Sequence, residues 1–273
     1  MTNQIKSTLK DVPETMLWTL YNRATEAKRD DAIIVDDKCI EIFDSIKYDY
    51  SKSFGKAEPS HAVRSLLFDR EVKDFLSRNP KGTIVNLGEG LETQRFRIKD
   101  TEAFWISVDL PEAIEIRERF ITPTKRHIHS PVSVLDRKWF EWVPKNEPVF
   151  ITAQGLFMYL QEEEIKKLIQ DMFSTFKEGS LMFDTIPKWI SNKTVSEKGW
   201  KKTNSYTTPK MPWGIDRNQI QGLKKWSSSI QNIEEVIYYF PRGLQKWFFK
   251  FVLITPKLKN HAPTIVKMDF KNR

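Results

Sequence analysis

The first third of the chain carries apolar residues at three- and four-residue spacing, which is the period of an amphipathic helix. This pattern predicts a helix over residues 12–28 and another over residues 61–78. Between them, Asp36-Asp37 is an N-terminal signal for a helix that carries Cys39 and Ile46 on its apolar face. The polar residues 48–55 are expected to form a loop. We therefore predict an N-terminal helical extension over residues 1–80.

From residue 83 onward, short β-rich runs alternate with helical ones. The pattern predicts strands over residues 83–87, 104–108, 127–133, 149–153 and 180–184, and helices that start at Pro111 and at residue 161. Repeated β-α-β units with almost continuously apolar strands are typical of a parallel sheet that helices cover on both faces. Right-handed crossovers then place the carboxyl ends of these strands on one edge, where ligands bind.

After Pro187 this alternation stops. Residues 188–230 are polar and rich in tryptophan and proline, and we interpret them as an inserted lid of helices and loops. The pattern then predicts a strand over 234–240, a helix over 243–254 and a strand over 264–270. Residues 81–187 and 231–273 would thus form one α/β core. The expected fold is Rossmann-like, with a mostly parallel seven-stranded sheet.

Composition narrows the classes of partner. The net charge is +8, but 44 Lys and Arg residues are interleaved with 36 Asp and Glu residues. Because no nucleic-acid motif frames the basic residues, we interpret them as solvated surface and expect no nucleic-acid partner. Cys39 is the only cysteine, and its place on an apolar face favours a core role. Residues 1–6 lack the apolar core of a signal peptide and no apolar run is long enough to span a bilayer, so we expect a cytoplasmic protein without a membrane partner. The oligomeric state stays open.

The candidate chemistry begins at Gly88-Glu89-Gly90, directly after a predicted strand. Glycines there let the backbone approach a ligand closely, and Asp109, at the end of the next strand, suits ribose hydroxyls. Nicotinamide and S-adenosylmethionine binders share this pairing. A dinucleotide site needs a third glycine, but Thr93 stands there and Glu92 precedes it, so a pyrophosphate would be repelled. These residues favour S-adenosylmethionine. We expect no metal site, and interpret His127 and His129 as a strand-edge or solvated pair.

Several motifs together resemble the leucine carboxyl methyltransferase family. Residues 86–96 are similar to its first motif, residues 105–111 to its second, and residues 153–160 to its fourth-strand motif. Residues 18–24, the helix with Arg64 and Asp69, and residues 211–216 also match. The resemblance extends from about residue 12 to 270. It is greatest to the bacterial branch that includes the tetracenomycin polyketide synthesis O-methyltransferase.

The resemblance implies a class I methyltransferase fold and S-adenosyl-L-methionine as cofactor. Arg64 would pair with the carboxylate of the cofactor, Asp109 would hold its ribose, and Leu135 and Asp136 would frame its adenine. The residues that it assigns to cofactor binding are Arg64, Gly88, Glu89, Gly90, Asp109, Leu110, Leu135, Asp136, Gln154 and Gly155. Two positions depart from the family pattern: Gln154 replaces a common glutamate, and Val134 stands where an acid often precedes Leu135.

The implied activity is O-methylation of a carboxylate or a phenolic hydroxyl on a small molecule, such as a polyketide-like metabolite. A carboxylate needs no general base, whereas a phenol with a pKa near ~10 benefits from one. Tyr21, Arg23 and Tyr159 are the candidates for shaping or orienting the acceptor, although packing or surface roles fit them nearly as well. The alternatives are a protein carboxyl methyltransferase, an NAD-dependent oxidoreductase and a non-enzymatic protein with a basic nucleic-acid surface.

Overall fold

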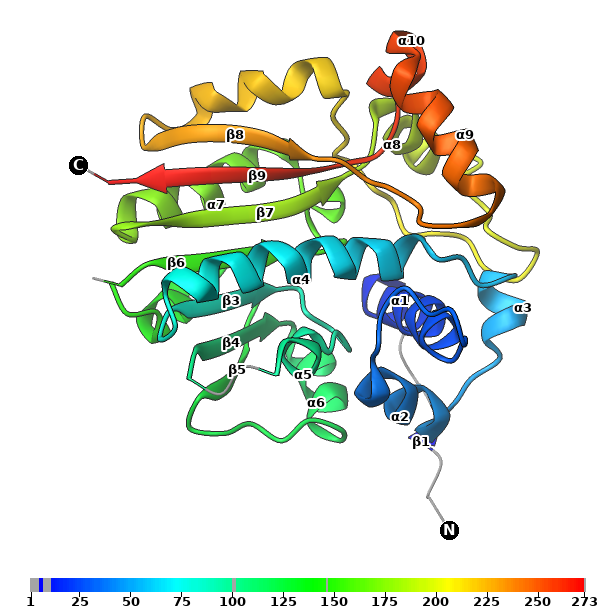
Figure 1. Ribbon diagram of the computed structural model, residues 1–273, viewed down its shortest axis with the longest axis horizontal. Helices are drawn as coiled ribbons and strands as arrows, with labels where there is room; N and C mark the ends of the chain where they lie inside the picture. Colours follow the sequence, from blue (N-terminus) through cyan, green and yellow to red (C-terminus); the bar gives the residue numbers. More distant parts are fainter. Residues whose placement is uncertain (1–4, 7–10, 100–101, 146, 273) are drawn as a thin grey trace.

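A seven-stranded sheet runs through the centre of the molecule, with the strand order β5-β4-β3-β6-β7-β9-β8 (Figure 1). The computed structural model describes residues 5–6, 11–99, 102–145 and 147–272. The expectation that the chain starts without a signal peptide rests partly on residues 1–4, which lie outside this range. The strands are β3 (Thr83–Leu87), β4 (Phe104–Asp109), β5 (His127–Pro131), β6 (Val149–Ala153), β7 (Glu178–Thr185), β8 (Ile230–Val236) and β9 (Thr264–Lys271).

Six of the seven strands run in the same direction, and β9 runs against both of its neighbours. β3 pairs in parallel with both β4 and β6, β4 pairs with β5, and β6 pairs with β7. β9 lies antiparallel between β7 and β8. The predicted fold class, a mostly parallel seven-stranded sheet of Rossmann-like type, is confirmed. A separate parallel pair joins β1 (Ile5–Lys6) to β2 (Ile46–Lys47).

Helices cover both faces of the sheet because successive strand residues point to opposite sides. In β3, Ile84 packs in one cluster with residues of α4, whereas Val85 packs in another with residues of α7. Figure 1 shows α4 on the near face and α7 behind the sheet. The longer helices are α1 (Asp11–Ala27), α2 (Asp37–Ser45), α4 (Ser60–Arg78), α6 (Pro111–Glu118), α7 (Glu162–Thr175), α8 (Lys188–Val195) and α9 (Gly243–Ile254); the short ones are α3 (Tyr50–Phe54), α5 (Gln94–Ile98) and α10 (Pro256–Asn260), with 3-10 turns η1 (Arg137–Trp142), η2 (Phe157–Tyr159) and η3 (Arg217–Trp226).

The N-terminal helices α1, α2 and α3 lie at the end of the sheet where the carboxyl ends of the parallel strands point (Figure 1). They share a third hydrophobic cluster, in which Leu17 and Leu20 of α1 and Cys39 of α2 are fully buried. Leu91, from the segment after β3, packs in the same cluster. The extension therefore closes the edge at which the predicted ligand turn lies. Cys39 is a core residue as expected, and burial raises the pKa of its thiol to about 12.

Two predicted elements differ from the structure. Residues 48–55 are not all loop, because Asp49 accepts a hydrogen bond from the backbone N–H of Lys52 and caps the short helix α3. β8 lies over Ile230–Val236 rather than residues 234–240. Residues 188–230, for which the sequence predicts a lid, contain α8 and η3, joined by irregular backbone. Within the described ranges, no helix has the length and apolar character needed to cross a bilayer.

Candidate active site

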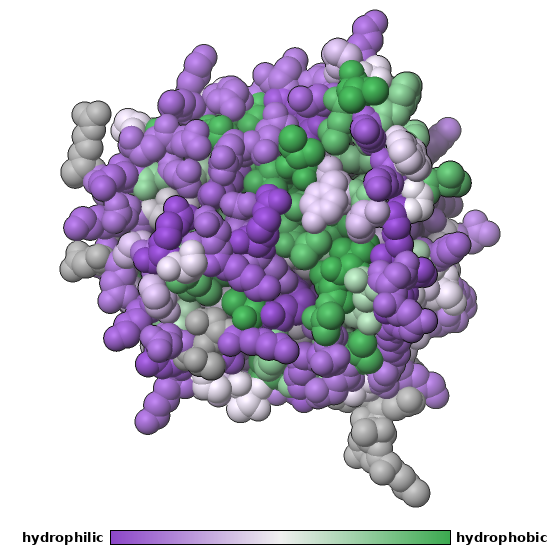
Figure 2. Space-filling model, in the orientation of Figure 1, coloured by the Kyte–Doolittle hydropathy of each residue, from purple (hydrophilic) through white to green (hydrophobic). Residues whose placement is uncertain are grey.

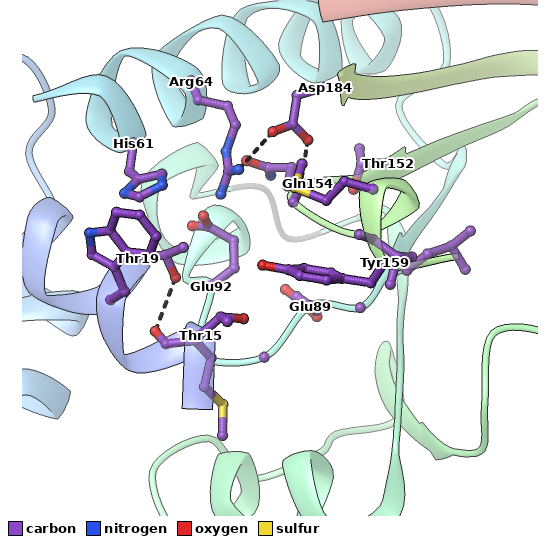
Figure 3. Close-up of a pocket in the computed structure, with 18 of the residues that line it drawn as sticks. Thr15, Thr19, His61, Arg64, Glu89, Glu92, Thr152, Gln154, Tyr159 and Asp184 are labelled. Carbon is purple, nitrogen blue, oxygen red and sulfur yellow. Dashed lines mark hydrogen bonds and ion pairs between the residues drawn. The ribbon is translucent and has the colours of Figure 1, made fainter. Parts of the chain in front are cut away.

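A cavity of about 270 Å³ opens at the carboxyl edge of the parallel strands. The segments that follow β3, β4, β6 and β7 form one side of it, and α1 and the start of α4 form the other (Figure 3). Nine residues assigned from the sequence line this cavity: Arg64, Gly88, Glu89, Gly90, Asp109, Leu110, Gln154, Gly155 and Tyr159. Sequence elements far apart in the chain thus converge on a single site.

The turn after β3 has a backbone conformation that favours glycine. Gly88 and Gly90 have φ values of 62° and 51°, in the left-handed region. A Cβ atom on Gly88 would lie 2.8 Å from Cδ1 of Leu156, and one on Gly90 would lie 2.9 Å from Cβ of Met16. The turn therefore leaves no room for side chains between the sheet edge and α1.

The carboxylate of Asp109, at the end of β4, is hydrogen-bonded to this turn. Oδ2 of Asp109 accepts a hydrogen bond of 2.7 Å from the backbone N–H of Gly90, and Oδ1 accepts one of 2.8 Å from that of Leu110. Burial raises the pKa of Asp109 to about 6, although both hydrogen bonds oppose the rise. The carboxylate is thus fixed by two backbone donors at the edge of the cavity.

Arg64 of α4 reaches the opposite end of the cavity and pairs with Asp184 of β7. Nη1 of Arg64 lies 2.8 Å from Oδ2 of Asp184, and the backbone N–H of Gly155 donates to Oδ1 of the same carboxylate at 2.5 Å. Gly155 has a φ of 67°, and a Cβ there would lie 2.9 Å from Nη1 of Arg64. Burial alone would lower the pKa of Arg64, but the Asp184 carboxylate raises it overall. The guanidinium therefore stays charged at the cavity wall.

Three polar side-chain atoms of the cavity residues have no hydrogen-bond partner among the described residues: Nε of Arg64 and two acceptor oxygens. Oε1 of Gln154 and Oε2 of Glu89 are buried without a hydrogen bond. The other oxygen of Glu89 lies 3.0 Å from Nη2 of Arg117 and accepts from Nδ2 of Asn86. Because buried polar atoms are usually satisfied, these two acceptors indicate a site built for a polar ligand.

The side chain of Arg23 does not face the cavity in which a methyl acceptor would bind. Its side chain is fully buried outside the cavity, with Nη1 at 2.7 Å from Oε1 of Glu92 and Nη2 donating to the carbonyl of Leu91. Glu92 also lies 2.6 Å from Nη1 of Arg97, which itself pairs with Asp36 at 2.7 Å. The two cations hold the pKa of Glu92 well below its usual range, despite burial.

These residues, with Asp69, form what we call the buried ion network: Arg23, Asp36, Asp69, Glu92 and Arg97. Asp69 joins it through Arg97, whose Nε lies 2.7 Å from Oδ2 of Asp69. Arg64 and Asp69 of α4 are both buried. The network links α1, the start of α2, α4 and the turn after β3.

Three other assigned residues lie away from the cavity lining. Tyr21 packs its ring against Tyr50, with centroids 5.4 Å apart, and its hydroxyl donates to the carbonyl of Gly55. Leu135 packs against the core, and Asp136 caps η1 by accepting from the backbone N–H of Lys138. The structure therefore gives Tyr21, Leu135 and Asp136 structural contacts and does not bring them together with the other site residues.

His61, at the start of α4, is a cavity residue that the sequence did not single out. The backbone N–H of Glu58 donates to Oδ1 of Asn22, which fixes the orientation of that amide. Nδ2 of Asn22 then donates to Nδ1 of His61 at 2.8 Å, so the neutral ring carries its proton on Nε2. Burial, with help from the positive charges of Arg64 and Arg23, lowers the pKa of His61 well below its usual value. The ring is a neutral donor.

Tyr159 and several apolar side chains complete the same side of the cavity. Figure 3 shows the Tyr159 ring extending across the cavity from η2. Its hydroxyl is hydrogen-bonded to Thr15, and burial raises its pKa to about 12. Trp18 of α1 stands edge-on to the His61 ring at 5.6 Å. The apolar lining comes from α1, the segments after β6 and β7, and residues 188–230, and includes Trp18, Met158, Ile186, Ile190, Trp200 and Met211.

The histidine pair lies on the edge strand β5, as expected, but it is not solvated. His127 is buried, and its Nε2 lies 2.8 Å from Oγ of Ser107. Nδ1 of His129 lies 3.1 Å from Glu118. Across the described residues, no cluster of three or more His, Cys, Asp or Glu side chains is arranged to hold a metal ion.

Comparison with known proteins identifies the class of this site. The tetracenomycin polyketide synthesis O-methyltransferase TcmP of Streptomyces glaucescens is 26% identical over 263 residues, which cover 92% of this chain and 94% of that protein. The S-adenosyl-L-methionine-dependent methyltransferase dpfgK of Gibberella zeae is 26% identical over 72% of this chain and 76% of its own length. The plantazolicin methyltransferase BpumL, solved in complex with SAH, matches 95% of this chain and 98% of its own with a TM-score of 0.52 and 13% identity, and so shares the fold.

The family assignment rests on a match to a family model. A model of the family described as leucine carboxyl methyltransferase matches residues 16–173, from α1 to α7. This range contains the glycine turn, Asp109 and the segment after β6. S-adenosylmethionine and nicotinamide binders share the glycine turn, and the family match favours S-adenosylmethionine over the nicotinamide alternative. The chain belongs to the leucine carboxyl methyltransferase family and is an S-adenosylmethionine-dependent methyltransferase.

Proposed function

We propose that this enzyme methylates the carboxylate of a small, largely apolar acid. Bound S-adenosylmethionine supplies a methyl group on a sulfonium centre, which an oxygen nucleophile can attack. The acceptor would lie on the side of the cavity lined by Trp18, His61 and Tyr159. The name of the family, which refers to a carboxyl group, and the name of TcmP, which refers to polyketide O-methylation, support an oxygen acceptor.

The residues at the strand edge fit the cofactor. Gly88 and Gly90 give its amino-acid end close access to the backbone, and Asp109 offers a carboxylate for ribose hydroxyls. The unpaired acceptor oxygens of Gln154 and Glu89 suit an ammonium group, and Arg64 suits a carboxylate. Gln154 would accept from the ammonium group as a neutral amide, where many family members have a glutamate.

The choice of a carboxylate as the acceptor rests on one observation. Every acidic side chain that lines the cavity already has a charged or backbone partner. Glu92 pairs with Arg23 and Arg97, Asp184 with Arg64, Glu89 with Arg117, and Asp109 accepts from two backbone N–H groups. The oxygen of Glu89 that stays unpaired would receive the ammonium group of the cofactor. None of the four acids would then be left to serve as a base for a phenol.

The polar groups on the acceptor side are donors rather than bases. His61 is neutral with its proton on Nε2, and Tyr159 keeps its proton because its pKa is raised to about 12. A site with neutral donors favours an acceptor that is already ionised, since such an acceptor needs no proton transfer. Orientation by His61 and Tyr159 would then supply much of the rate acceleration.

The test uses matched acceptors and matched variants. Apolar aromatic acids and the corresponding phenols are incubated with enzyme and methyl-labelled cofactor, and products are identified by mass spectrometry. We expect methyl esters of the acids, at a rate that changes little between pH 7 and pH 9. His61→Gln, which keeps an N–H donor, should retain more activity than His61→Leu. Methylation of phenols alone, with equal loss in both variants, would refute the proposal. Labelling of peptide C-termini alone would favour a protein substrate.

A further inference from the structure

The helix α9 turns its apolar side away from the protein. Leu244, Trp247, Phe248, Phe251 and Ile254 recur at helical spacing and are 89%, 66%, 66%, 55% and 70% exposed. We call these five residues the outer face of α9. In Figure 2, hydrophobic residues form a band from the centre toward the upper right, where Figure 1 places α9 and α10. A contiguous apolar surface of this kind usually marks an interaction site.

The inner side of the same helix is anchored to the protein. Val252 is buried, and the ring of Phe249 contacts those of Phe240 and Tyr238, at centroid distances of 5.3 Å and 6.2 Å. Tyr238 also lines the cavity. The outer face is therefore held at a fixed orientation, one aromatic layer away from the proposed active site.

The charged residues of α9, of α10 and of the sequence that flanks them are all basic. Between Glu235 and Asp269 the sequence contains no acidic residue. Lys246 and Lys250 flank Trp247, and each Nζ lies 5.9 Å from its ring. The segment α10 adds two more lysines, at positions 257 and 259. In the part of the chain that the structure describes, none of these four lysines forms an ion pair. Their charge is available to an anionic partner.

This charge pattern disfavours a second copy of the chain as the partner. In a two-fold interface, the same patch meets itself, so the lysines beside one outer face would approach those beside the other. An anionic lipid surface instead complements the lysines and accepts the aromatic and aliphatic side chains. A helix of the length of α9 spans ~18 Å, well short of the ~30 Å bilayer core, and so would lie in the plane of the membrane.

We propose that α9 docks the enzyme on an anionic membrane surface. The outer face would enter the boundary between headgroups and acyl chains, and the four lysines would contact lipid phosphates. Tryptophan, phenylalanine and leucine on one side of a helix with lysines beside them are typical of helices that bind in this way. The expectation of no membrane partner rested on the absence of a spanning segment, which this mode of binding does not require.

The test measures sedimentation of the full chain with lipid vesicles. We expect binding to vesicles of equal parts phosphatidylcholine and phosphatidylglycerol, little binding to phosphatidylcholine alone, and weaker binding when salt is raised to about 0.5 M. Phe248→Glu should reduce partitioning at least about tenfold, because it places a charge in the apolar contact. Replacing Lys246 and Lys250 together by glutamate should have an effect of at least similar size, about tenfold.

The matched control is Trp142→Ala, since Trp142 is 56% exposed on η1, a separate element of the surface. It should bind vesicles like the unchanged protein, and circular dichroism should show that every variant is folded. Absence of binding to anionic vesicles would overturn the proposal, and so would equal losses in Trp142→Ala and Phe248→Glu. A dimer in analytical ultracentrifugation that Phe248→Glu dissociates would also overturn it in favour of a second copy.

Discussion

Replacing Gly90 by alanine should destabilise the protein and weaken cofactor binding. Gly90 has a φ of 51°, and an added Cβ would lie 2.9 Å from Cβ of Met16 on α1. That neighbour is attached directly to the helix backbone, so it cannot turn away as the end of a long side chain can. Either α1 or the turn after β3 must shift, and the turn also holds Asp109.

The magnitude follows from three contributions. The left-handed backbone costs about 1–2 kcal/mol for a residue with a Cβ. Overpacking against Met16 adds about 1–3 kcal/mol. The loss of chain entropy in the unfolded state offsets about 0.4–1 kcal/mol. The net decrease in the free energy of unfolding is then about 1–5 kcal/mol. Each kcal/mol should lower the Tm by roughly 2–4 °C in a domain of this size.

Two other glycines separate these contributions. Gly243 has a φ of 70° but no atom within 4 Å of an added Cβ, so Gly243→Ala reports the backbone term alone. Gly222 has neither a positive φ nor a neighbour within 4 Å, so Gly222→Ala should be neutral or slightly stabilising. Urea unfolding and titration with S-adenosylhomocysteine measure all three variants. If Gly90→Ala loses no more stability than Gly243→Ala and binds the ligand normally, the close approach of α1 to the turn has no energetic role.

Three further predictions concern charged and polar side chains of the site. Glu92→Gln removes one of the two carboxylates that Arg23 and Arg97 share, the other being Asp36, and should cost about 3–5 kcal/mol of stability in urea unfolding. Glu163→Gln, on the surface of α7, should change nothing measurable, and equal costs would contradict a role for burial. Because the pKa of Asp109 is raised to about 6, the affinity for S-adenosylhomocysteine should fall about tenfold between pH 7 and pH 5, as the carboxylate is protonated, and Asp109→Asn should bind weakly without this pH dependence. The same shift makes ionisation of Asp109 destabilising, so its contribution to stability decreases as pH rises from about 4 to about 6. Tyr159→Phe should lower kcat/KM about fivefold, the value of one neutral hydrogen bond, and leave the pH profile between pH 7 and pH 10 unchanged; a lost pH-dependent limb would instead identify Tyr159 as a base.

Most of the sheet was predictable because β3, β4, β6 and the buried half of β7 are short, mostly apolar runs. β8 was misplaced for a physical reason. It is an edge strand with an irregular register between Ile230 and Asn232, and only Ile230, Ile233 and Val236 are buried. This three-residue spacing hides the alternation of a strand. The helix α3 was missed because its buried residues, Tyr50 and Phe54, lie only one turn apart in a polar segment.

The cofactor side of the site was predictable because its features are local. A glycine turn and an acid at the end of a strand are visible in the sequence, and the parallel topology brings them together. The direction of a helical side chain depends instead on tertiary packing. Tyr21 and Arg23 lie on α1, as does the cavity residue Trp18, but only Trp18 points to the cavity. His61 gave no signal because its role depends on Asn22, from a different helix.

The position of β9 has a consequence for how the protein is made. β9 comes last of the seven strands in the sequence, yet it lies between β7 and β8. Roughly 80 residues separate the end of β7 from the start of β9, so at ~5–20 residues per second a ribosome needs ~4–16 s to add them. During that interval the edge of β7 has no partner strand, and an unpaired apolar edge is prone to pair with other chains. Yield during rapid overproduction should therefore depend on chaperones that shield this edge until β9 is complete.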